Sequence, residues 1–145
     1  MEINRPPKGV AIIVHVILWI HVGSAITGFV LSGIVSFWVF RHARGRDLVP
    51  AFWIWQRITQ WLTVALGAAG MGLYLLGRRP SDPLHLLYGA LAILAIILLG
   101  AFGPKRDPGA LLEGWQVNPA WILFGLNVFL WAMYGRGLTT GFFGF

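Results

Sequence analysis

Long apolar segments separated by short polar connections make up this chain. From Val10 to Phe40 the sequence contains no Asp, Glu, Lys or Arg, and an α-helix over that run would be roughly 46 Å long. About 20 apolar residues suffice to cross the core of a bilayer, so this segment is long enough to cross with tilt or with an end protruding. We predict helices over about 10–40, 50–76, 84–102 and 119–134. The pattern predicts an all-α fold, an integral membrane four-helix bundle, as a single transmembrane domain over residues 1–145.

The first apolar segment does not have the form of a cleaved signal peptide. The apolar region of a signal peptide covers about 7–15 residues and precedes an A-x-A-like site, whereas the segment here is twice as long and has no such site. We therefore interpret it as a membrane-spanning helix. The polar connections are expected to be a basic turn at 41–47, a second turn at 77–83, a longer loop at 103–118 and a tail after 134.

Composition supports a chain surrounded by lipid. Hydrophobic residues make up 57% of the 145 positions and charged residues 11%, against roughly 25% charged residues in soluble domains. Every acidic residue falls in the predicted tail or in a polar connection: Glu2, Asp47, Asp82, Asp107 and Glu113. The net charge of +6 is modest for a membrane protein and does not indicate nucleic-acid binding.

An even number of spanning helices places both termini on one side of the membrane. The basic cluster Arg41, Arg44 and Arg46 follows the first helix, and basic clusters favour the cytoplasmic side. We therefore expect both termini outside, although the terminal side carries almost as many basic residues.

Several kinds of chemistry are excluded by residues that the chain lacks. Without Cys there are no disulfides, iron–sulfur clusters or covalently attached c-type haem. The apolar segments hold no carboxylate for acid–base catalysis or a di-iron site, and no phosphate-binding Gly-rich loop, HExxH or GxSxG motif occurs. Histidine remains as the group most able to carry chemistry, because ionisable side chains inside a membrane usually have a function.

Three histidines fall within the predicted helices: His15 and His21 on the first, and His85 at the start of the third. Six residues separate His15 from His21, which amounts to about 9 Å of rise and about 240° of rotation, so one metal ion cannot take both. His15 and His85 lie at similar predicted depth and are candidate axial ligands of a metal held between two helices. His21 is the alternative partner of His85, if the third helix extends deeper than we place it.

Haem b matches the residues at that end of the bundle. It needs two axial ligands, here His15 and His85 or His21 and His85, and cations for its two propionates. Arg78 and Arg79 are on the same side as these histidines. A simpler interpretation pairs each imidazole with a hydroxyl or carbonyl of a neighbouring helix, and the two arginines with lipid headgroups. Asn127, in the fourth helix, is expected to hydrogen-bond across the bundle.

A resemblance points the same way. The stretches WIHVGSAITGFVLSGIVSFWVFRHAR and PLHLLYGALAIL, with a late YGRGLTTG, resemble small bacterial four-helix membrane proteins related to copper-resistance D and b-type cytochromes. The resemblance covers about half of the chain. It implies a four-helix bundle in the bacterial inner membrane, with His21 and His85 as the positions of interest.

These observations leave two main functions open. One is a small subunit of a larger membrane complex that binds haem b or a related tetrapyrrole for electron transfer, exchanging electrons with a quinone or a partner subunit. The other is a structural accessory subunit without cofactor, which associates with other membrane subunits or with itself. A small transporter is a third possibility, although Thr63 and Asn127 are almost the only polar groups in mid-span.

Overall fold

A computed structural model describes residues 8–103 and 118–142, and four long helices account for most of them. They are α1 (Lys8–Ala43), α2 (Ala51–Leu75), α3 (Leu84–Leu99) and α5 (Pro119–Phe142). The all-α, four-helix prediction is confirmed for this part of the chain. The loop predicted over 103–118 lies almost entirely outside the described residues.

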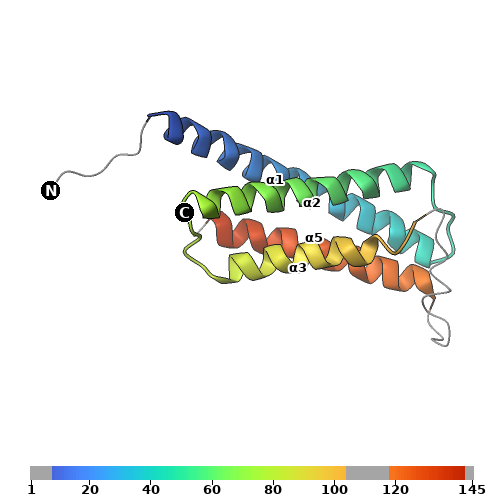
Figure 1. Ribbon diagram of the computed structural model, residues 1–145. Helices are drawn as coiled ribbons and strands as arrows, with labels where there is room; N and C mark the ends of the chain where they lie inside the picture. Colours follow the sequence, from blue (N-terminus) through green and yellow to red (C-terminus); the bar gives the residue numbers. More distant parts are fainter. Residues whose placement is uncertain (1–7, 104–117, 143–145) are drawn as a thin grey trace.

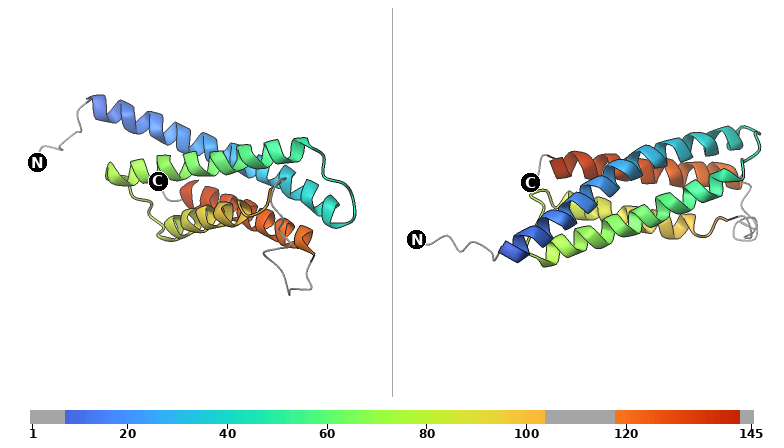
Figure 2. Two further views of the ribbon diagram at one scale, coloured as in Figure 1. Left: turned by 45° about the vertical axis from the view of Figure 1, so that its right-hand side comes forward. Right: turned by 90° about the horizontal axis from the view of Figure 1, so that it is seen from above.

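The helices form a bundle in which α1 and α3 run in one direction and α2 and α5 in the other (Figures 1 and 2). α1 packs extensively on α2 and on α5, and α5 also packs on α3, whereas α2 and α3 touch only slightly. The bundle is therefore closed on three sides and loose along the fourth, between α2 and α3.

α1 and α2 are each followed by a glycine with positive φ, Gly45 and Gly77. The motif at Gly77 positions the candidate residue Arg78. Gly77 has a φ of 81°, its N–H donates to the carbonyl of Tyr74 at 3.0 Å, and the N–H of Arg78 donates to the carbonyl of Leu73 at 2.9 Å. This is a Schellman motif, which needs a residue without a Cβ at the left-handed position. The motif at Gly77 stops α2 abruptly and fixes Arg78 at that end of the bundle.

α5 is longer than predicted, because it continues past Tyr134 to Phe142. The glycines of this stretch indicated a tail, but tertiary contacts keep it helical. Gly135 lies beside the ring of Phe29, where an added Cβ would be 3.2 Å from Cε2. Thr139 and Thr140 both donate to the carbonyl of Arg136 at 2.9 Å. The extra turns bring Thr140 to the level of α3's first residues.

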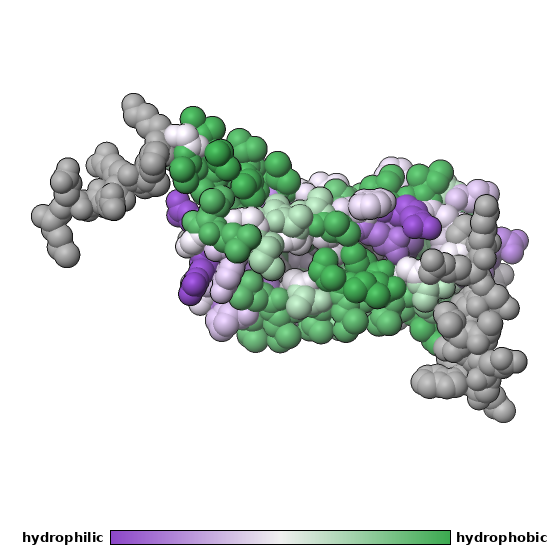
Figure 3. All heavy atoms as spheres, in the orientation of Figure 1, coloured by the Kyte–Doolittle hydropathy of each residue, from purple (hydrophilic) through white to green (hydrophobic). Residues whose placement is uncertain are grey.

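Two helices, α1 and α2, are long and apolar enough to cross a membrane, and α3 is a shorter apolar helix. Large apolar side chains cover much of the outside of the bundle (Figure 3). The buried interior of the described part contains small and large apolar residues together with seven polar ones: Ser32, Ser36, Gln56, Thr59, Thr63, Asn127 and Thr140. The interior of the described part is thus mixed, and large apolar side chains are exposed on the outside.

The two ends of the bundle differ in packing. The end formed by the C-terminal part of α1 and the N-terminal part of α2, here called the closed half, has a continuous apolar core that includes Val35, Val39, Phe52, Leu99 and Leu123. At the opposite end α1 extends beyond the other helices (Figure 1). Its first turns carry exposed apolar side chains, and Trp19 is 71% exposed.

Candidate functional site

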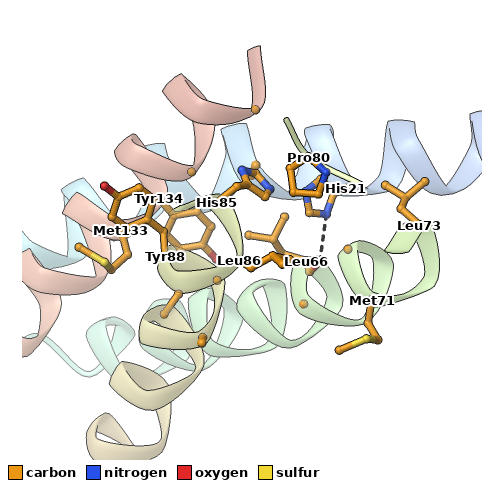
Figure 4. A pocket seen from close by; sticks show the side chains of 18 of the residues that line it. His21, Leu66, Met71, Leu73, Pro80, His85, Leu86, Tyr88, Met133 and Tyr134 are labelled. Carbon is orange, nitrogen blue, oxygen red and sulfur yellow. Dashed lines mark hydrogen bonds between the residues drawn. The ribbon is translucent and has the colours of Figure 1, made fainter. Parts of the chain in front are cut away.

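A cavity of about 510 Å³ lies in the loose half of the bundle, between α2 and α3 (Figure 4). Its walls are largely apolar, and three glycines leave space for it: Gly67 and Gly70 on α2 and Gly89 on α3. The size is within the range of about 300–1,000 Å³ that is typical of small-molecule and cofactor sites. We refer to it as the histidine cavity, because His21 and His85 both line it.

The two histidines come together from different helices. The ring centroids of His21, in the middle of α1, and His85, in the first turn of α3, are 5.9 Å apart, with an angle of 49° between the planes. Both lie at one end of the cavity, while Tyr134 lies toward the other (Figure 4). Each imidazole is half-buried.

Each histidine has its Nδ1 atom engaged by a neighbouring helix. Nδ1 of His21 lies 3.1 Å from the backbone carbonyl of Leu66, and because a carbonyl can only accept, Nδ1 is the donor in this bond. Nδ1 of His85 lies 3.1 Å from Oγ1 of Thr140, and the carbonyl of Gly137 is a further hydrogen-bond partner of His85. Metal-bound histidines commonly have one ring nitrogen held in this way, which orients the other nitrogen toward the metal.

Gly70 permits the position of His21. A Cβ built on Gly70 would lie 3.0 Å from Cε1 and 3.3 Å from Nδ1 of His21. The imidazole therefore packs directly on the backbone of α2, where it reaches the Leu66 carbonyl one turn away. A larger residue at position 70 would push the ring aside.

The polar rim of the cavity comes from arginine and tyrosine. Arg78, which follows Gly77, lines the cavity together with Tyr88 of α3. Arg136 is outside the lining but donates to the hydroxyl of Tyr88, with Nη2 at 3.2 Å, and its Cζ atom lies 5.3 Å from the centre of the Tyr88 ring. The cavity is thus mainly apolar, with cationic groups at the same end as the two histidines.

The opposite end of the cavity is formed by a hydrogen-bonded pair. The hydroxyl of Tyr134 on α5 and Oγ1 of Thr63 on α2 are 2.8 Å apart. Thr63 donates its single proton to the carbonyl of Thr59 at 2.9 Å, so Tyr134 must be the donor in the pair. Tyr134 fits there because Gly28 of α1 has no side chain, and the Tyr134 hydroxyl lies 2.5 Å from where a Cβ would be.

The candidate residues are only partly brought together. His21, His85 and Arg78 line one cavity. His15 is exposed on α1 and is not part of the lining, so the pair formed is His21 with His85, the alternative left open above. Arg79 is exposed, and its Cζ atom lies over the ring of Tyr74 at 5.2 Å.

The reason for the His21 pairing is the stagger of α1. Equal depths measured from the helix ends would match His15 with His85, but α1 starts well beyond the ends of its neighbours. A shift of six residues along a helix corresponds to about 9 Å, which is enough to replace His15 by His21 at the level of His85.

Some site residues were not identified from the sequence. Tyr134, Thr140 and Gly70 carry contacts of the site. Tyr134 and Thr140 belong to the YGRGLTTG stretch, but neither they nor Gly70 were singled out as site residues. Asn127 does not hydrogen-bond across the bundle as predicted, because its Nδ2 donates to the carbonyl of Leu123 in its own helix at 2.9 Å. The spacing of Thr63 and Asn127 in mid-span was the one available signal for a polar interior.

Within residues 8–103 and 118–142, no three His, Cys, Asp or Glu side chains are grouped so as to hold a metal ion by themselves. No family model, curated protein or solved structure matches this chain.

Proposed function

We propose that this chain is a multi-pass membrane protein of the bacterial inner membrane that binds haem b between His21 and His85 and transfers electrons as a small subunit of a larger complex. The observation that carries the proposal is the His21–His85 pair, with ring centroids 5.9 Å apart. Two imidazoles this close could both reach one metal ion, because a metal–nitrogen bond is about 2 Å long.

The distribution of polarity supports the membrane setting. α1 and α2 have the length and composition of spanning helices, and apolar side chains are highly exposed along the bundle, such as Trp61 at 69% and Ile97 at 65%. Soluble monomers seldom expose apolar patches of more than a few hundred Å². In a bilayer these exposed apolar side chains would contact lipid. Polar side chains buried between helices contribute to helix association there.

The chemistry of the cavity lining is compatible with haem b. Its walls are largely apolar, which suits a porphyrin ring, and Arg78 at the rim could pair with a propionate. His21 and His85 would hold the group, and each is itself held through Nδ1 by Leu66 or Thr140. These second contacts fix the ring orientation and raise the basicity of the ligating nitrogen.

Haem b, when bound, supplies a one-electron couple whose potential depends on its ligands and surroundings. The chain's own contribution is to bind, orient and shield. Two histidines, rather than one, would hold the group from both α1 and α3, which suits electron transfer. The apolar walls lower the local polarity, and Arg78 and Arg136 place positive charge near the site.

The projecting part of α1 supports a role as a subunit. In its first turns Ile12 and Ile13 are 65% and 54% exposed, and this segment diverges from the other helices (Figure 2). A helix of a partner subunit packed there would extend the bundle. This surface also fits a structural accessory subunit, so the cofactor must be tested directly.

The test is optical spectroscopy of the protein purified from haem-sufficient cells. We expect a Soret band and, after dithionite reduction, a sharp α band typical of two histidine ligands. His21→Ala and His85→Ala should each abolish the α band. His15→Ala and His42→Ala are matched controls that should retain it, because His15 is exposed and His42 hydrogen-bonds at the far turn to the carbonyl of Arg46.

Two results would contradict the proposal. A folded but colourless protein that also fails to bind added haem would exclude haem b and favour the accessory role. Loss of the band in His15→Ala with retention in His21→Ala would show that the ligands are not those at the cavity.

A further inference from the structure

The buried polar side chains continue beyond the histidine cavity into the closed half. Gln56 of α2 is 3% exposed and Asn127 of α5 is fully buried. Neither belongs to the lining of the cavity. Two amide side chains in so apolar a core require an explanation, because burying an amide without a partner costs several kcal/mol.

The register of α2 and α5 places Gln56 and Asn127 at one level. The two helices run in the same direction, and the Thr63–Tyr134 hydrogen bond of 2.8 Å joins them across the bundle. Gln56 precedes Thr63 by seven residues, and Asn127 precedes Tyr134 by seven. Seven residues make about two turns, or about 10 Å, so each amide returns to the same inward face two turns from the pair.

Three polar atoms at this level have no hydrogen-bond partner among the described residues: Nε2 and Oε1 of Gln56 and Oδ1 of Asn127. Together they offer two acceptors and one donor group. A buried water molecule typically makes about three hydrogen bonds to such groups. The chemistry of the set therefore fits water, which both donates and accepts, better than an ion of either sign.

The hydroxyls nearest to this level do not satisfy the amide atoms. Thr59 and Thr63, both buried, lie one and two turns beyond Gln56 on α2. Oγ1 of Thr59 donates to the carbonyl of Trp55 at 3.0 Å, and Oγ1 of Thr63 donates to the carbonyl of Thr59 at 2.9 Å. Both hydroxyl protons are therefore taken by backbone carbonyls of the same helix, which leaves water as the partner for the amides.

We propose that Gln56 and Asn127 bind internal water in the core between α2 and α5. One water molecule can accept from Nε2 of Gln56 and donate to Oδ1 of Asn127, and Oε1 of Gln56 can accept from a second. Gln56 is in the second turn of α2, so the water site lies toward the end of the bundle that carries Arg41 and Arg57. The water site does not rest on the function proposed above.

The first experiment uses the unmodified protein in lipid bilayers, with the side-chain amides of Gln and Asn labelled with ¹⁵N. In water-edited solid-state NMR we expect magnetisation to pass rapidly from water to the amides of Gln56 and Asn127. We also expect these amide protons to exchange in D₂O with the bundle intact. Slow transfer together with protected amides would show a dry core and overturn the proposal.

Variants locate the water. Gln56→Met with Asn127→Leu should remove the water signal in this part of the core, whereas Gln60→Met, a half-buried position on the same helix, is the matched control and should leave it. Retention of the signal in the double variant, or its loss in Gln60→Met, would contradict the water site.

The two proposals fail separately. If water is found at Gln56 and Asn127 in a protein that binds no haem, the water site is supported and the haem proposal is excluded. If the protein binds haem but the core at Gln56 is dry, the haem proposal is supported and the water site is excluded.

Discussion

The closed half and the histidine cavity are built from the same four helices but differ in how tightly the helices pack. In the closed half, side chains such as Val39, Phe52 and Leu99 are buried between the helices and pack in one apolar cluster. Around the cavity, α2 and α3 make few contacts with each other, and several glycines are in the lining. His21, His85 and Tyr134 also line this space. The comparison teaches that the bundle is held together at one end, so that the other end can remain open for a ligand.

The largest expected effect comes from shortening a side chain in the packed core. Leu130 of α5 is fully buried, and Leu130→Ala should lower the free energy of unfolding by about 2–5 kcal/mol, as removal of a packed leucine does elsewhere. Leu86→Ala is the matched control, because Leu86 lines the cavity and is 49% exposed. Denaturation of both variants in mixed micelles measures the difference. Equal losses would show that the two halves are packed alike.

A smaller effect is expected where the two halves meet. Gly28→Val would place atoms where the Tyr134 ring lies, so the ring must move and its hydrogen bond to Thr63 should break. Overpacking of this kind costs about 1–3 kcal/mol. Gly23→Val is the matched control, because a Cβ at position 23 of the same helix would have no neighbouring atom within 4 Å. It measures the effect of valine on the helix without the clash. Thermal unfolding of the two variants should differ, and identical transitions would contradict the Tyr134 placement.

The smallest effect on stability, but a specific one on the site, is expected from Gly70→Ala. The new methyl group would lie 3.0 Å from Cε1 of His21, so the imidazole must shift by a few tenths of an ångström while the fold remains. We expect weaker haem binding and an altered reduced spectrum, with thermal stability close to that of the unmodified protein. Gly125→Ala, on the exposed face of α5, should change neither. An unaltered spectrum in Gly70→Ala would show that His21 does not bind the ligand.

The fold class was largely predictable because it follows from hydropathy. Apolar runs of sufficient length predict helices wherever they lie, and the predicted starts of α2, α3 and α5 agree with the structure to within one residue. The end of α5 was not predictable, because glycine and threonine after Tyr134 weaken local helix propensity. Contacts made by Gly135 with Phe29 and by Thr140 with His85 favour the helix there.

The sequence alone determined which groups are available for chemistry: histidine and arginine without Cys, and a core free of carboxylates. Only the tertiary structure decided that His21 rather than His15 meets His85, and that Gln56 and Asn127 share one level. The physical reason is that helix length and composition are local properties, whereas the stagger between helices is set by side-chain fit. Tyr134 against Gly28 and His21 against Gly70 are contacts of that kind, and a shift of less than two turns between α1 and its neighbours would have assembled a different site.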